Sequence, residues 1–176
     1  DRIYAFKDRS ASTTKGESDL VDMTNFYSLS QAGQKSVLDS LNTSTNCGWY
    51  IVLDKKAGEK CLATPVVYSK VAYFTTFSPD TEAISDPCFI GEGTAALYAV
   101  NYGTGEAAFN FDLTNDSGGT VVKAKSDRST VIGSAIPSGV VITVIGGKVT
   151  AYIGVGGGVN RPSLSTTRSM FPVHWK

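Results

Sequence analysis

Short apolar runs, separated by glycine-rich or polar turns, form the main pattern of this chain. Valine, isoleucine, tyrosine, phenylalanine and threonine dominate the runs, a composition that favours β-strands. "PVVYSKVAYFTTF" (65–77) predicts a hairpin that turns at residues 68–70, and "TAALYAV" (94–100) predicts a third strand. "EAAFNFDL" (106–113) is the expected fourth strand, because the glycines of the 103–105 turn tolerate the positive φ of a tight hairpin.

Parts of this unit recur elsewhere in the chain. "IYAFKD" (3–8) resembles the third strand, and "GWYIVL" (48–53) resembles the fourth. "SGVVITVIGGKVTAYIGV" (138–155) resembles the first hairpin, with glycines at its turn, and "FPVHWK" (171–176) predicts an outer strand. Repeated units of four short antiparallel strands are typical of β-propeller blades, which contain about 40–45 residues each.

The fold prediction is therefore all-β. Residues 1–176 are expected to form a single domain, a partial β-propeller of roughly two to three four-stranded blades. A β-sandwich built from similar strands is the alternative. "NDSGGTVVKAKSDRS" (115–129) is expected to link two blades.

One short helix is expected to interrupt the strands, at "SLSQAGQKSVLDSL" (28–41). Ser28 is followed three residues later by Gln31, which is the spacing of a capping box. Three apolar residues then fall on one helical face: Val37, Leu38 and Leu41.

Charge and hydropathy exclude two classes of partner. The chain has 16 basic and 16 acidic residues, so it lacks the positive excess that binds nucleic acid or anionic lipid. Its longest apolar run, "GVVITVIGG" (139–147), is strand-sized, whereas a membrane-spanning helix needs about 18 apolar residues. We therefore expect neither a nucleic-acid partner nor a membrane span.

The sequence offers no arrangement of catalytic or cofactor-binding residues. Its single histidine, His174, is not accompanied by any sign of a nucleophilic triad. "GVGGGV" (154–159) does not lead into a helix, as a phosphate-binding loop must. Four acidic residues lack the spacing of a calcium loop and are expected to be solvated: Asp80, Glu82, Asp86 and Glu92. The prediction is a non-enzyme without a cofactor or a metal.

Three cysteines, Cys47, Cys61 and Cys88, cannot all pair within the chain. None has the CxxC spacing of a zinc site. They form either one disulfide with one remaining thiol, or three buried thiols. An oxidising location favours one bridge, with Cys88 as the expected member because it lies in a polar loop.

An ordered set of motifs resembles the C-terminal domain of PilC/PilY-type proteins, which lie at the tips of type IV pili. The motifs cover nearly the whole chain: "SDLVDMTN" (18–25), "GWYIVLD" (48–54), "GEKCLATPVVYSKVAYFTTFSP" (58–79), "DPC" (86–88), "GTAALYAVNYGTG" (93–105), "IGSAIPSGVVI" (132–142), "AYIGVGGG" (151–158) and the terminal "VHWK". The resemblance implies a seven-bladed modified propeller on a large secreted or outer-membrane protein, active in pilus biogenesis, adhesion and surface sensing.

The resemblance sets expectations for function. It implies a non-catalytic, extracellular or cell-surface protein that acts through protein–protein interaction. The calcium loop of the family is not found in this chain, so no calcium switch is carried over. The "LYALDxxTGE"-like strand and turn also resemble quinoprotein dehydrogenase propellers, which gives a fragment of such an enzyme as the alternative.

The length of the chain predicts incomplete blades. At about 40–45 residues per blade, it falls short of most closed propellers, which need about four to eight blades. Open strand edges are therefore expected at both ends of the chain: Arg2, Ile3, Tyr4, Ala5, Phe6, Val173, His174 and Trp175. The expected partners are the remaining blades, from another chain or precursor segment, pilus minor pilins, or further copies that assemble into a filament.

Overall fold

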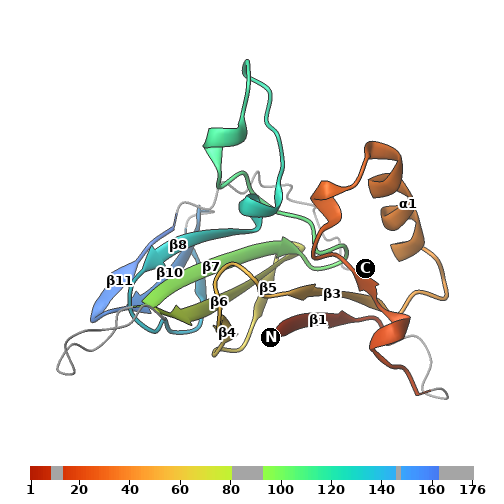
Figure 1. The fold of residues 1–176 in the computed structure, drawn as a ribbon. Coiled ribbons are helices and arrows are strands. Elements are labelled where there is room, and N and C mark those ends of the chain that lie inside the picture. Colours follow the sequence, from red (N-terminus) through yellow and green to blue (C-terminus); the bar gives the residue numbers. More distant parts are fainter. Residues whose placement is uncertain (9–13, 81–92, 146–147, 163–176) are drawn as a thin grey trace, which may run out of the picture.

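The computed structural model of the chain describes residues 1–8, 14–80, 93–145 and 148–162. These residues form strands β1 to β11 in three sheets, none of which closes into a ring, and the helix α1. Figure 1 shows the longest strands, β6 and β7, between the β1–β3 ribbon on one side and β10–β11 on the other. The expected all-β class with one helical insertion is confirmed.

The central sheet has five strands, in the order β4-β6-β7-β8, with β5 also paired to β6. Its strands are β4 (Lys60–Cys61), β5 (Val66–Tyr68), β6 (Val71–Pro79), β7 (Gly93–Asn101) and β8 (Ser129–Gly133). The predicted β5–β6 hairpin is confirmed, and the two residues of its turn, Ser69 and Lys70, both have positive φ.

Two three-stranded sheets flank the central one. The first has the order β1-β3-β2 and consists of β1 (Arg2–Phe6), β2 (Val21–Asp22) and β3 (Gly48–Val52). β3 pairs with β1 in antiparallel and with β2 in parallel orientation.

The second flanking sheet has the order β11-β10-β9. It contains β9 (Val141–Ile145), β10 (Lys148–Val155) and β11 (Gly158–Asn160). The predicted β9–β10 hairpin is confirmed by its pairing register. Gly156 and Gly157 have positive φ and turn the chain from β10 into β11, so this glycine-rich stretch connects strands.

The alternation of side chains along β7 joins the three sheets. One face of β7 contributes Ala96, Tyr98 and Val100 to a core that includes Trp49, Met23 and Leu41. Its other face contributes residues 95, 97 and 99 to a second core with residues of β10. Because successive strand residues point to opposite faces, a single apolar strand fills both cores.

The expected fourth strand at 106–113 is wrong. In this segment only Ala107 makes an isolated bridge, to Val100. Phe109 and Phe111 instead pack their rings against the second core, which takes the chain off the sheet edge. Tertiary packing thus overrides the strand-like alternation of the segment.

The segment 115–129 does not link two blades as expected. It belongs to a long excursion that stands away from the sheets and returns to β8, the neighbour of β7 in the same sheet (Figure 1). The buried Asp127 carboxylate anchors the excursion by accepting the backbone N–H groups of Asp112 and Ala124, at 2.8 and 2.7 Å.

The helix α1 (Gln31–Leu41) begins later than the sequence indicates. Ser30, and not Ser28, caps it by accepting the backbone N–H of Gly33 at 3.2 Å. Ser28 belongs to a preceding short 3-10 helix (Phe26–Ser28). The predicted apolar face is confirmed, since Leu41 is fully buried and its two partners pack against the same core.

Replacing Ser30 with alanine should therefore lower the free energy of unfolding by about 1 kcal/mol, because the first helical turn loses its side-chain cap. Ser28→Ala is the control and should cost less, since the Ser28 hydroxyl bonds only the carbonyl of Asn25. Urea unfolding followed by circular dichroism measures both changes. An equal or larger loss for Ser28→Ala would contradict the assignment of the cap.

Candidate functional site

Among the described residues, β1 pairs with β3 on one side and with no strand on its outer edge. The N–H of Leu53 bonds the carbonyl of Asp1 at 2.9 Å, and the N–H of Lys7 bonds the carbonyl of Cys47 at 2.8 Å. Backbone hydrogen bonds to β3 therefore come from every second residue of β1. The N–H and C=O groups of the odd-numbered residues point toward β3. The backbone N–H and C=O groups of Arg2, Tyr4 and Phe6 point away from β3, and no described backbone group pairs with them.

The side chains of β1 divide into a buried face and an exposed aromatic face. Ile3 and Ala5 pack against the first core. Tyr4 and Phe6 are 42% and 62% exposed, and their rings stack with centroids 5.9 Å apart. Two adjacent exposed aromatic rings on an unpaired strand edge are unusual in a monomer and are typical of an interaction surface.

Charged side chains fix the position of β1 at its N-terminal end. The Arg2 guanidinium donates to both carboxylate oxygens of Glu17 at 2.8 Å and lies over the ring of Tyr50. The Tyr4 hydroxyl donates to the same carboxylate at 2.6 Å. The hydrogen bond with Tyr4, and then the charge of Glu17, raise the pKa of Arg2.

An apolar groove of about 290 Å³ runs beside β1. Trp49 and Phe74 contribute to its lining, together with Val67 of β5 and Tyr102. The indole N–H of Trp49 donates to the carbonyl of Tyr102 at 3.0 Å, which holds the ring in place. The groove thus combines apolar walls with a strand that has free backbone donors and acceptors.

Gly48 determines how closely β1 can approach β3. It has a φ of +127°, and a Cβ atom at this position would lie 1.8 Å from the carbonyl oxygen of Ala5. Only glycine fits there, so the pairing of β1 depends on this residue.

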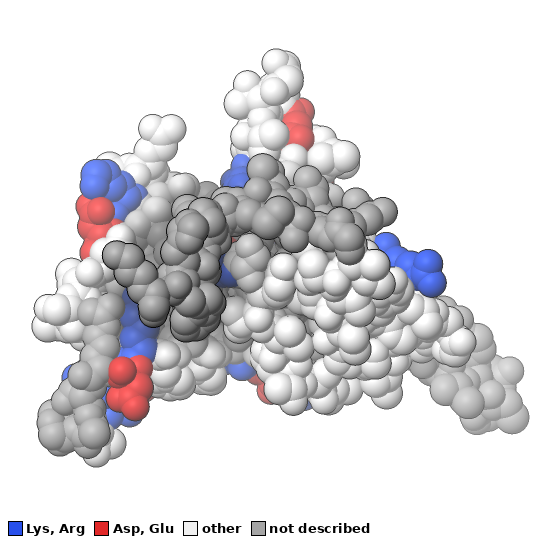
Figure 2. Space-filling model, turned by 180° about the vertical axis from the view of Figure 1, so that it is seen from behind, with Lys and Arg blue, Asp and Glu red and all other residues white. Residues whose placement is uncertain are grey.

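β9 forms a second sheet edge, which has no partner strand in the described part of the chain. Val141, Val144 and Ile145 of this strand are 59%, 46% and 74% exposed. Figure 2 shows that the surface on the side of this sheet is largely uncharged, whereas the charged side chains gather mainly on the opposite side of the molecule. The sequence of β9–β11 agrees, because Lys148 is its one charged residue.

The remaining predicted residues are distributed as follows. Val173, His174 and Trp175, and also Cys88, lie outside the described residues. Cys47 is buried and Cys61 half-buried, and both are free thiols, so they do not bridge each other. Burial raises the pKa of the Cys61 thiol, which makes it a poor nucleophile.

Asp80 is solvated, as expected, and makes a surface ion pair with Lys56 at 3.1 Å, while the other members of the acidic cluster lie outside the described ranges. Among the residues that the structure describes, no group of three or more His, Cys, Asp or Glu side chains could hold a metal ion. Within the same part of the chain, no helix is long and apolar enough to cross a membrane.

Sequence reasoning placed a strand near the first residues, where β1 lies, but missed the groove beside it. The groove joins residues from β1, β3, β5 and β6 and the turn after β7, and no local pattern brings these together. The apolar character of Val67 and Phe74 was visible, but it is equally typical of any buried strand.

Comparison with known proteins leaves the assignment to the geometry alone: the chain matches no protein-family model, no curated protein and no solved structure.

Proposed function

We propose that this chain is a non-catalytic, extracellular interaction module of the PilC/PilY pilus-tip type, and that it binds its partner by accepting a β-strand at β1. The observation that carries the proposal is the outer edge of β1, which borders an apolar groove and whose backbone groups have no partner among the described residues. Added strands gain affinity from main-chain hydrogen bonds and specificity from pockets for alternate side chains.

The expected partner is propeller sequence that completes the fold, from another chain or precursor segment, or a minor pilin. Face-to-face packing of three sheets through two cores supports this, since neighbouring propeller blades pack in that way. Because Cys47 and Cys61 are both free thiols in the structure, a cell-surface location favours oxidation of at least one cysteine through a bond to another chain. Thiol titration of the denatured, unreduced chain tests this point, and three free thiols would contradict it.

A self-assembling filament is the second candidate function, and the edge of β9 favours it. The open edges of β1 and β9 lie on different sheets, so a contact between them would join different surfaces of successive copies. Such heterologous contacts build rings when the rotation closes and filaments when it does not.

An enzyme of the quinoprotein type is a further alternative, which an assay for dye-linked alcohol oxidation tests.

Tyr4→Pro should weaken association at the β1 edge by about 10- to 100-fold. Proline removes the outward N–H of residue 4, so a carbonyl of the incoming strand loses its donor. Tyr4→Thr is the matched control, because it removes the same ring and hydroxyl but keeps the N–H. Light scattering and sedimentation velocity over a range of concentrations measure self-association, and pull-down of pilus-tip proteins measures partner binding.

Equal association of the proline and threonine variants would contradict strand addition at β1. A wild-type chain that stays a monodisperse 18.6 kDa monomer, with full protection of its strands from hydrogen exchange, would contradict both partner completion and the filament.

A further inference from the structure

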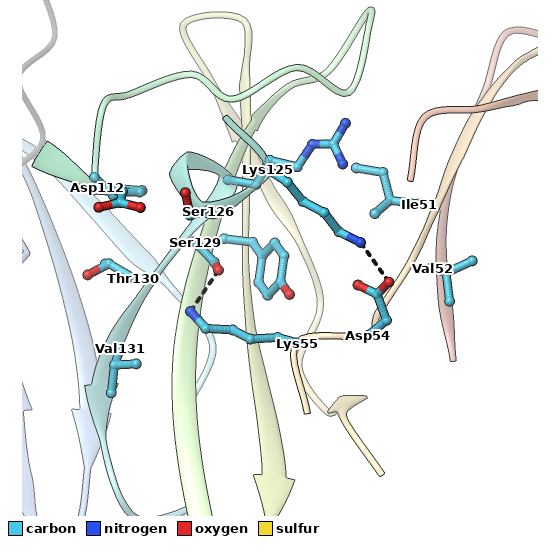
Figure 3. A pocket seen from close by; sticks show the side chains of 13 residues that line it. Ile51, Val52, Asp54, Lys55, Asp112, Lys125, Ser126, Ser129, Thr130 and Val131 are labelled. Atoms are coloured by element: carbon cyan, nitrogen blue, oxygen red, sulfur yellow. Dashed lines mark hydrogen bonds and ion pairs between the residues drawn. The ribbon is translucent and has the colours of Figure 1, made fainter. Parts of the chain in front are cut away.

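A second cavity, of about 600 Å³, lies away from the β1 edge, between the end of β3 and the segment 125–131 (Figure 3). Its apolar lining includes Ile51, Phe111 and Val131. Its charged lining comprises three cationic and two acidic side chains: Lys55, Lys125, Arg128, Asp54 and Asp112. A cavity of this size, mostly apolar with a few convergent polar groups, is typical of a site for a small molecule.

Two of the three cations in the lining already have their partners. Lys125 makes an ion pair with Asp54 at 2.6 Å, across one side of the cavity (Figure 3). The guanidinium of Arg128 is buried and donates to the backbone carbonyls of Met23 and Thr24. The terminal nitrogens of both side chains thus have protein partners, while the Nε of Arg128 has none among the described residues.

Lys55 differs from both. Its ammonium donates to the hydroxyl of Ser129 at 2.9 Å, and no carboxylate among the described residues lies within ion-pair distance of it. The nearby Glu59 is buried and uses its oxygens elsewhere, since they accept the Thr76 hydroxyl and the backbone N–H of Lys55. Figure 3 shows the Lys55 side chain extended along the cavity toward Ser129.

Lys55 is exposed as a residue, but its side chain contributes to the lining of the cavity. Burial lowers the pKa of Lys55, an effect that the charge of Glu59 only partly offsets. An ammonium group has three donors, and the structure uses one of them on a neutral hydroxyl. An anion bound beside Lys55 would accept the remaining donors in charge-assisted hydrogen bonds.

We propose that this cavity binds a small organic carboxylate with an apolar body. The carboxylate bonds the ammonium of Lys55 and the hydroxyl of Ser129, and the body lies against Ile51, Phe111 and Val131. A free phosphate fits less well, because the lining is largely apolar and the other cations are already engaged. This site is independent of strand addition at β1.

Titration with 4-phenylbutyrate, followed by ¹H–¹⁵N correlation spectra, tests the proposal. Amide shifts are expected for residues 55 and 129–131, and the neutral isostere 4-phenylbutyramide should bind at least about tenfold more weakly. Inorganic phosphate serves as the second comparison and should bind more weakly than 4-phenylbutyrate.

Lys55→Met should weaken 4-phenylbutyrate binding by about tenfold or more, because methionine keeps the apolar stem and removes the charge. Lys56→Met is the matched control and should bind as the wild type does, since Lys56 is the adjacent residue and pairs with Asp80 outside the cavity. Equal binding of the acid and the amide to the wild-type chain would overturn the proposal, whether or not Lys55→Met folds. Unchanged binding to a folded Lys55→Met would overturn it as well.

Discussion

Gly48→Ala is expected to detach β1 and to lower the free energy of unfolding by about 4 kcal/mol or more. The new Cβ would lie 1.8 Å from the carbonyl oxygen of Ala5, and the backbone at φ +127° disfavours any side chain. Strained backbone costs about 1–3 kcal/mol, and relief of the overlap costs a similar amount. Chemical unfolding gives the change in stability, and hydrogen exchange locates it.

Gly118→Ala is the control that separates conformation from overlap. Gly118 also has a positive φ, of +59°, but nothing lies within 4 Å of the place that a Cβ atom would occupy. This variant should cost only about 1–2 kcal/mol. Hydrogen exchange in Gly48→Ala should accelerate at Ile3 and Ala5 before the central sheet is affected. Equal losses of unfolding free energy in the two variants would show that the close approach of β1 to β3 does not set the cost of Gly48→Ala.

Arg128→Met is expected to cost about 3–5 kcal/mol. Arg128 is 1% exposed and donates to the carbonyls of Met23 and Thr24, which lie in the first core. Its guanidinium also lies over the ring of Tyr27, 5.2 Å from the centroid. Methionine fills much of the volume but leaves both buried carbonyls without a donor, at about 1–3 kcal/mol each.

Part of this loss is offset, because burying the charged guanidinium is itself unfavourable. Burial lowers the pKa of Arg128, and its Nε atom has no partner among the described residues. We expect the two carbonyls' loss of their hydrogen-bond donors to cost more than is gained by removing the buried charge. Removing one partner of a buried interaction is generally destabilising. Arg2→Met is the control and should cost much less, because the ion pair of Arg2 with Glu17 is exposed. Thermal and urea unfolding compare the two variants, and equal losses would contradict a structural role for Arg128.

Local patterns were sufficient for the hairpins. In each predicted hairpin, a short turn sequence separates two runs of β-branched and aromatic residues. The turn sequences are Ser69-Lys70 and the glycine pair at 146–147, and both hairpins are present. Alternation along 94–100 likewise predicted β7. These features depend on neighbouring residues, so sequence can indicate them.

The same alternation misled at 106–113, where Phe109 and Phe111 point to the second core without pairing as a strand. A period of two shows that alternate residues are buried, but it does not show whether the backbone finds a partner strand. The helix start was misplaced for a related reason: Ser28 and Ser30 are both good caps, and the preceding 3-10 turn decides between them.

The sequence by itself determined an all-β chain with two hairpins, one helix and a strand near its first residues, which the structure has at Arg2–Phe6. Only the tertiary structure decided that this strand borders an apolar groove, and that Lys55 meets Ser129 in a cavity, although these two residues are 74 positions apart. Strand pattern and turn chemistry are set by residues close together along the chain. Grooves and charge environments depend on which sheets pack together, and that choice is made by burial over the whole chain.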